Sequence, residues 1–154
     1  MKKLLILGIV ASTFFAACGG DSGQAGTDSS AETSASVSDY DPNRGEGKFD
    51  HVDLGDGLNK AMADAGKSTS EMKCLSCHKL TDEKLVGPGW AGVTERHKPE
   101  WIMNFMTNTD AMIDKDPKVQ AMLEICLVRM PNQNLTDEEA RSILEFMREN
   151  DGVK

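Results

Sequence analysis

The sequence is 154 residues long and carries a formal net charge of −8, with 25 acidic residues against 17 lysines and arginines. This length suits one small domain with extensions, and no internal repeat or second domain is visible. The acidic balance argues against nucleic acid as a partner, because such a chain would repel the phosphate backbone.

The chain begins with a segment typical of a secretory signal peptide, residues 1–17. Two lysines follow Met1, and residues 4–17 form an apolar run that is too short to span a bilayer comfortably. The run ends in Phe15-Ala16-Ala17-Cys18, which resembles the lipobox of bacterial lipoproteins. That resemblance implies cleavage before Cys18 and lipid attachment to its thiol. A plain leader and a soluble mature protein are the alternative.

Residues 18–47 are predicted to be the lipidated cysteine and a disordered linker. The linker consists mainly of Gly, Ser, Ala, Thr and Asp, and it cannot bury enough apolar surface to offset its conformational entropy. We expect a flexible tether between Cys18 and a folded domain at residues 48–154. A spacer without functional consequence is the other interpretation.

The first helical pattern of the domain is weak. Residues 58–65 have some helical character and Gly66 is expected to interrupt it. Ser68 or Ser70 can then cap a second helix that leads into the next motif.

The motif Cys74-Leu75-Ser76-Cys77-His78 has the spacing that attaches c-type haem. Two thiols three positions apart on a helical turn can add to the two vinyl groups on one porphyrin edge, which forms two thioethers. His78 then lies beneath the iron, where one ring nitrogen can bind the metal while the other donates a hydrogen bond. We predict Cys74 and Cys77 as covalent anchors and His78 as an axial ligand.

Three other chemistries use a similar cysteine pair. A thioredoxin-like dithiol would follow a buried strand, but no Val/Ile-rich run precedes Cys74. A zinc site would need two more ligands, and only Cys126, His51 and His97 remain, none of them paired. A disulfide across two intervening residues would constrain little of the unfolded chain.

A loop containing Gly87-Pro88-Gly89-Trp90 follows the motif. Pro88 has no N–H, so its carbonyl is free to face the His78 ring as an acceptor for the second ring nitrogen. An ordinary turn is the alternative.

Two helices are predicted after this loop. Pro99 begins one as its first residue, and Asp116-Pro117 begins the other. Their apolar faces are expected in the core: Trp101, Ile102, Phe105 and Met106 on the first, and Val119, Met122, Leu123 and Cys126 on the second. Cys126 is therefore predicted as a small buried residue, His51 as a solvated side chain, and His97 as a polar residue flanking the first helix.

Met130 is the predicted second axial ligand. Met103, Met106, Met122 and Met147 belong to predicted helices and Met112 to a polar loop, whereas Met130 precedes Pro131 in a non-helical segment. Such a segment lets the thioether point inward while the backbone runs along the haem. The capping box Thr136-Asp137-Glu138-Glu139 then begins a last helix.

The order of these motifs is similar to that of small bacterial class I c-type cytochromes over residues 68–150. The resemblance implies an all-α fold of four to five short helices around one covalent haem c, with His78 and Met130 as iron ligands and a Pro88 contact to His78. One departure is visible, because Thr69-Ser70 occupies a stretch that usually offers an aromatic residue to the last helix. Met72 and Phe146 are expected to meet instead.

The resemblance implies an electron-transfer protein rather than an enzyme, on the periplasmic side of a bacterial membrane. Its expected partners are redox proteins, such as a quinol-oxidising complex and a terminal oxidase or nitrogen-oxide reductase. A local excess of basic residues between Lys67 and Lys98 is a candidate docking rim, with a solvated surface as the alternative. A haem-based ligand sensor or small peroxidase with a labile sixth ligand is the rival function.

Overall fold

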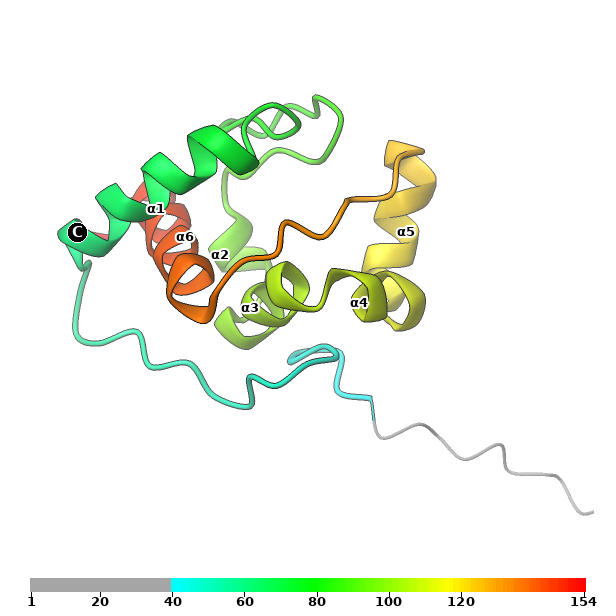
Figure 1. Ribbon diagram of the computed structural model, residues 1–154, viewed down its shortest axis with the longest axis horizontal. Helices are drawn as coiled ribbons and strands as arrows, with labels where there is room; N and C mark the ends of the chain where they lie inside the picture. The colour runs from blue at the N-terminus through cyan, green and yellow to red at the C-terminus, as the bar shows by residue number, and fades with distance from the viewer. Residues whose placement is uncertain (1–39) are drawn as a thin grey trace, which may run out of the picture. The chain divides into compact units, whose positions relative to one another are not determined.

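The structure, a computed structural model, describes residues 40–154. These residues form six α-helices and no strand, which confirms the all-α prediction. None of these helices is long and apolar enough to cross a membrane. Residues 1–39, which contain the predicted signal peptide, Cys18 and most of the linker, lie outside the described part. The helices are α1 (Lys60–Lys73), α2 (Val93–Arg96), α3 (Pro99–Thr107), α4 (Thr109–Lys115), α5 (Pro117–Cys126) and α6 (Asp137–Asn150) (Figure 1).

Three helix starts agree with the sequence signals. Pro99 is the first residue of α3, and the Asp116 carboxylate accepts hydrogen bonds from the first backbone N–H groups of α5. At the start of α6, the Thr136 N–H donates to the Glu139 carboxylate at 2.9 Å and the Glu139 N–H donates to the Thr136 hydroxyl at 3.1 Å. Local capping therefore fixes where the helices around the core begin.

The helix count and the first helix differ from the prediction. Four to five helices were expected, and the additional ones are the single turn α2 and the seven-residue α4. The predicted interruption at Gly66 is wrong, because α1 is continuous through it. Its N-cap is Asn59, whose side chain accepts from the Met62 N–H at 3.1 Å, so neither Ser68 nor Ser70 caps it.

The crossing of α1 and α6 explains why a glycine lies inside a helix. A Cβ atom on Gly66 would lie 1.9 Å from the carbonyl oxygen of Ser142, so only glycine allows the two backbones to approach this closely. The other buried positions of α1 are also small, Ala63 and Ser70. This stripe of small residues replaces an aromatic contact as the means of packing α1 on α6.

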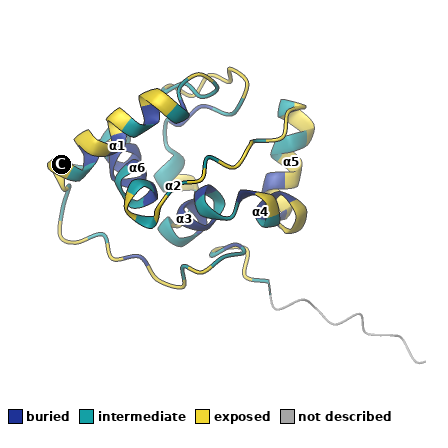
Figure 2. Ribbon diagram, in the orientation of Figure 1, coloured by how far each residue is buried: buried dark blue, intermediate teal, exposed yellow. Residues whose placement is uncertain are grey.

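Two methionines lie elsewhere than predicted. Met72 is 76% exposed while Phe146 is buried, so the expected contact between them is wrong. Met112 is fully buried in α4 instead of lying in a polar loop, and its sulfur accepts a hydrogen bond from the Glu46 N–H at 3.0 Å. The buried residues of α3, α4 and α6 form one core, which Figure 2 shows in dark blue.

A buried ion network lies at the α6 side of this core. The Glu145 carboxylate has no exposed surface and accepts hydrogen bonds from the Asn59 N–H at 2.8 Å and from the guanidinium groups of Arg141 and Arg148. Burial raises the pKa of Glu145, but these hydrogen bonds outweigh it, so the pKa is lowered overall. The network fastens the segment before α1 to α6.

The segment before α1 contacts the helices along much of its length. The buried Asn104 side chain accepts from the Phe49 N–H at 2.9 Å and donates to the carbonyls of Arg44 and Phe49 at 3.0 Å. The Tyr40 hydroxyl donates to the buried carboxylate of Asp116. Residues 40–47, assigned to the linker by composition, are therefore joined to α3 and to the start of α5.

Candidate functional site

The Cys74–His78 motif forms a tight turn at the end of α1. The N–H groups of Cys77 and His78 both donate to the Cys74 carbonyl, at 3.0 and 3.1 Å. Both cysteines are free thiols; Cys74 is buried and burial raises the pKa of its thiol, while Cys77 is half-buried. The turn thus presents two thiols and an imidazole within five residues at the edge of the core.

The His78 ring is held by the loop that follows it. Its Nδ1 donates to the Pro88 carbonyl at 2.8 Å, the contact expected from the Gly-Pro sequence. Burial lowers the pKa of His78, with the Pro88 hydrogen bond acting in the opposite direction. The imidazole is therefore neutral at neutral pH, and its Nε2 lone pair is available to a metal.

Gly87 sets the distance between this loop and the imidazole. A Cβ atom at position 87 would lie 2.4 Å from His78 Cε1 and 2.9 Å from both ring nitrogens. The Gly87 N–H donates to the Cys77 carbonyl at 2.8 Å, so the loop is fastened directly to the motif. Any side chain at this position would displace the ring or break that bond, which makes Gly87 part of the site.

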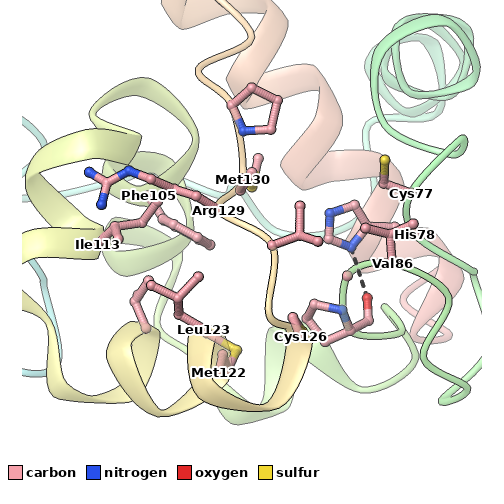
Figure 3. Close-up of a pocket in the computed structure, with 15 residues that line it drawn as sticks. Cys77, His78, Val86, Phe105, Ile113, Met122, Leu123, Cys126, Arg129 and Met130 are labelled. Carbon is pink, nitrogen blue, oxygen red and sulfur yellow. Dashed lines mark hydrogen bonds between the residues drawn. The ribbon is translucent and has the colours of Figure 1, made fainter.

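His78 and Met130 line the same cavity from segments that are far apart in the sequence. Figure 3 shows His78 on the loop after α1 and Met130 on the extended segment after α5. This cavity, of about 90 Å³, adjoins a second one of about 440 Å³, which is within the range of cofactor and small-molecule sites. Cys77, His78 and Met130 line both cavities, and Cys74 lines the second.

The segment that carries Met130 is fixed on both sides. Arg129 pairs with Asp114 of α4 at 2.9 Å and with Asp110 at 3.4 Å, and the capping box of α6 follows at Thr136. The backbone between these points contains no helix and no strand. The structure therefore places Met130 in a non-helical segment, as the sequence predicts.

α5 directs an apolar face toward the cavity, at the edge of the protein core. Val119 is its only buried residue, while Met122, Leu123 and Cys126 line the cavity and are half-exposed. The prediction that Cys126 is buried is therefore wrong for the polypeptide alone, because the face of α5 that carries it is not covered by another helix. An apolar body in the cavity would cover this face.

The walls of the two cavities suit a large apolar group with anionic substituents. Most lining residues are apolar, and none of them is Asp or Glu. The cationic residues among them are Arg129 in the first cavity and Lys73 and Arg96 in the second, where His97 lies beside Arg96. A porphyrin with two carboxylates matches this combination, so the residues present fit a haem.

The three histidines behave differently. His51 is 84% exposed, as expected for a solvated side chain. His97 is not merely a flanking residue: its ring stacks on Trp101 at 3.8 Å with an interplanar angle of 11°, and it lines the second cavity. Sequence reasoning missed this role because a histidine just before a proline-capped helix is usually solvated.

The structure does not favour the zinc or the thioredoxin-like interpretation of Cys74 and Cys77. Among residues 40–154 there is no group of three or more His, Cys, Asp or Glu side chains that could hold a metal ion. The motif also follows a helix instead of a strand. The zinc and thioredoxin-like interpretations therefore lack the partners they require.

Comparison with known proteins decides between the remaining interpretations. A family model described as cytochrome c matches residues 63–151. The chain belongs to the cytochrome c family. A solved cytochrome c from Rhodothermus marinus is similar to this cytochrome at 34% identity and a TM-score of 0.66, covering 68% of this chain and 90% of that one.

Two engineered forms of the Rhodothermus cytochrome, called Rma TDE, are also similar at 33% identity, with TM-scores of 0.65 and 0.62 and the same coverage. The second is described as bound to a carbene intermediate. No curated protein matches the chain.

Family membership confirms the predicted class I c-type cytochrome and its cofactor, one covalently bound haem c. Haem-based electron transfer follows as the general function of this cytochrome. A covalently bound haem fits the two free thiols at the end of α1 and the apolar face that α5 leaves half-exposed.

Proposed function

We propose that this cytochrome is a membrane-tethered carrier of single electrons between respiratory proteins on the periplasmic side of a bacterial membrane. The observation that carries the proposal is the pairing of His78 and Met130 on one cavity, which fits a six-coordinate iron with no position left for a substrate. Cys74 and Cys77 would hold the haem through thioethers, and the haem supplies a one-electron couple.

The chain's own residues would orient and tune the cofactor. The Pro88 carbonyl holds the His78 tautomer with Nε2 free, and Gly87 lets the loop contact the ring. The Met130 thioether is a soft ligand that favours the ferrous state and raises the potential. With the haem bound, the apolar residues of α5 would exclude water from it, which would limit reorganisation when the charge changes.

The proposed docking surface is the apolar rim, defined as the exposed apolar residues of the two segments that carry the cavity-lining Val86 and Val128: Leu85, Val86, Ile125, Leu127 and Val128. Val86 and Val128 line the cavity itself, so a partner on the rim would lie close to the haem edge. An exposed apolar group of this kind is the usual mark of an interaction surface.

The basic rim expected from residues 67–98 supports docking less well than the apolar rim. Lys67, Lys73 and Lys79 form ion pairs with Glu71, Glu139 and Glu83. These pairs reduce the field that the lysines present to a partner. We therefore expect the association rate with a redox partner to depend only weakly on salt.

Replacing Met130 by Ala tests the proposed ligand. We expect retained covalent pigment, a lower reduction potential, loss of the far-red absorption of the ferric protein, and rapid carbon monoxide binding by the ferrous protein. Met122→Leu is the matched control, because Met122 lines the same cavity from α5 and its replacement should leave all four properties unchanged. An unchanged potential in Met130→Ala would mean that another residue binds the iron.

The membrane tether is proposed from Cys18 and the linker. Cys18→Ser, expressed with its leader, should move the cytochrome from the membrane fraction to the soluble periplasmic fraction and abolish labelling by a radioactive fatty acid. A wild-type protein that is soluble and unlabelled would contradict the tether and leave the electron-carrier proposal intact.

The proposed electron donor is a quinol-oxidising complex or another cytochrome, and the proposed acceptor is a terminal oxidase or nitrogen-oxide reductase.

A ligand sensor or small peroxidase is the second candidate. The description of an engineered Rhodothermus relative with a bound carbene intermediate motivates a direct test in this chain. Rapid carbon monoxide uptake by the unaltered ferrous protein would support this candidate, whereas slow or absent uptake would support the electron carrier.

A further inference from the structure

His97 lies at the wall of the second cavity in a fixed orientation. It is the C-cap residue of α2, and its N–H donates to the Val93 carbonyl at 3.1 Å. Its ring stacks face to face on Trp101, and the Trp101 Nε1 donates to the Asp116 carboxylate at 2.7 Å. The imidazole is therefore held by both its backbone and its ring face.

The Nδ1 atom of His97 is buried and has no hydrogen-bond partner. A buried polar atom without a partner costs about 1–3 kcal/mol, so such atoms are normally paired in the functional molecule. The nearby Asp116 carboxylate cannot serve, because Lys118, Val119, Trp101 and Tyr40 already donate to it. The missing partner must come from outside the described polypeptide.

The haem has suitable groups. Cys74 and Cys77 would hold its two vinyl groups, which leaves its two propionates free to contact other residues of the cavity wall. The cavity that His97 lines contains no Asp or Glu, and its neighbour Arg96 brings a guanidinium that is held by the carbonyls of Gly89 and Ala91. This part of the wall is built to receive an anion.

We infer that His97 binds a haem propionate and that the proton it shares with this carboxylate is linked to the oxidation state of the iron. The inference rests on the haem being attached as described above. His97 acts here as a positioning residue, because it contacts a substituent of the cofactor and not the iron.

The charges around His97 set the direction of this linkage. Burial, and then the charges of Lys118 and Arg96, lower the pKa of His97 to about 4 in the polypeptide alone, with Asp116 acting in the opposite direction. A propionate beside the ring would add negative charge and bring the pKa back toward neutrality. Ferric iron carries one more positive charge than ferrous iron, so the proton is bound less tightly in the oxidised protein.

The reduction potential should therefore fall as pH rises between the pKa values of the oxidised and the reduced protein. A tenfold difference in proton affinity between the two states corresponds to about 59 mV between the high and low plateaus. The test is a potentiometric titration of the holoprotein from acidic to alkaline pH, together with nuclear magnetic resonance titration of His97 in both oxidation states.

Two variants distinguish the effect of the titrating proton on the reduction potential from the effect of the hydrogen bond. His97→Asn keeps a donor near the Nδ1 position but cannot titrate, so the potential should become independent of pH over the wild-type step while the far-red band is retained. His97→Phe keeps the stacking on Trp101 and loses the donor, so it should lose the step and also shift the potential.

His51→Asn is the control, because this exposed histidine should leave the step unchanged. A step that persists in His97→Asn, or a flat wild-type profile, would overturn the inference. Failure of the cofactor assignment is distinguishable, because it would appear as absent covalent pigment and not as a flat potential.

Discussion

The apolar surface of the folded domain is covered in different ways on its α1–α6 side and on its α5 side. On the α1–α6 side the polypeptide closes on itself: α6 buries seven residues, and Gly66 brings two backbones into direct contact. On the α5 side only Val119 is buried, and the apolar face points into a cavity. The first side is stabilised by helix packing, whereas the second depends on a cofactor to cover its apolar surface.

Gly66→Ala is expected to cause the largest loss of stability on the α1–α6 side. Alanine favours helix by about 1 kcal/mol over glycine, yet its Cβ would collide with the backbone of α6. We expect a loss of more than about 3 kcal/mol, at the upper end of overpacking effects. Denaturant unfolding of the holoprotein measures it. Gly57→Ala is the control, since its Cβ would meet only an ordinary contact at 3.4 Å, and equal stability of the two variants would refute the close crossing.

Glu145→Gln tests the ion network on the same side. Breaking a buried ion pair typically costs 3–5 kcal/mol, and because glutamine can keep part of the hydrogen bonding we expect about 3 kcal/mol at neutral pH. The folded pKa of Glu145 is lowered, so its contribution is complete above the unfolded pKa of about 4.3 and is lost as pH falls through the folded value.

The stability difference between wild type and Glu145→Gln should therefore shrink in acid. Thermal unfolding at several pH values between neutrality and acid measures it. Glu124→Gln, on the exposed face of α5, should show no such difference, and a pH-independent difference for Glu145→Gln would argue against the lowered pKa.

The smallest expected effect concerns Leu127, which ends α5 with a left-handed backbone (φ 59°) and an exposed side chain. This conformation costs a non-glycine residue about 1–2 kcal/mol, while glycine adds about 0.4–1 kcal/mol of unfolded-state entropy. Leu127→Gly should therefore stabilise by about 0.5–1 kcal/mol, seen as a higher melting temperature.

Leu127→Ala distinguishes relief of backbone strain from loss of a docking contact, because alanine removes most of the side chain but keeps the strain of the left-handed backbone. Both variants should slow electron transfer to a partner if the apolar rim docks it, but only the glycine variant should melt higher. If neither changes the transfer rate, Leu127 is not part of the docking surface.

Local chemistry made much of the fold predictable. Proline at the start of α3, Asp116 at the start of α5 and the capping box of α6 act within four residues, so their signals are complete in the sequence. The Cys74–His78 motif and the segment of Met130 were visible for the same reason.

The remaining features depend on contacts between distant segments. From the sequence alone, Gly66 indicates an interrupted helix, because its close contact with Ser142 forms only in the folded chain. Met112 likewise resembles a loop residue, because the Glu46 N–H that bonds its sulfur is distant in the sequence. Cys126 has the spacing of a core residue because the pattern cannot tell a protein core from a cofactor surface. His97 could not be found, because its stacking partner and its cavity exist only in the folded chain.

The bond from Tyr40 to Asp116 has a mechanical consequence. Asp116 also caps α5 and anchors the indole of Trp101, so one carboxylate joins the incoming chain to two walls of the haem cavity. Movement of Tyr40 would therefore act directly on this carboxylate. A change at Asp116 would therefore act on the start of α5 and on Trp101 together, and so on two walls of the cavity at once.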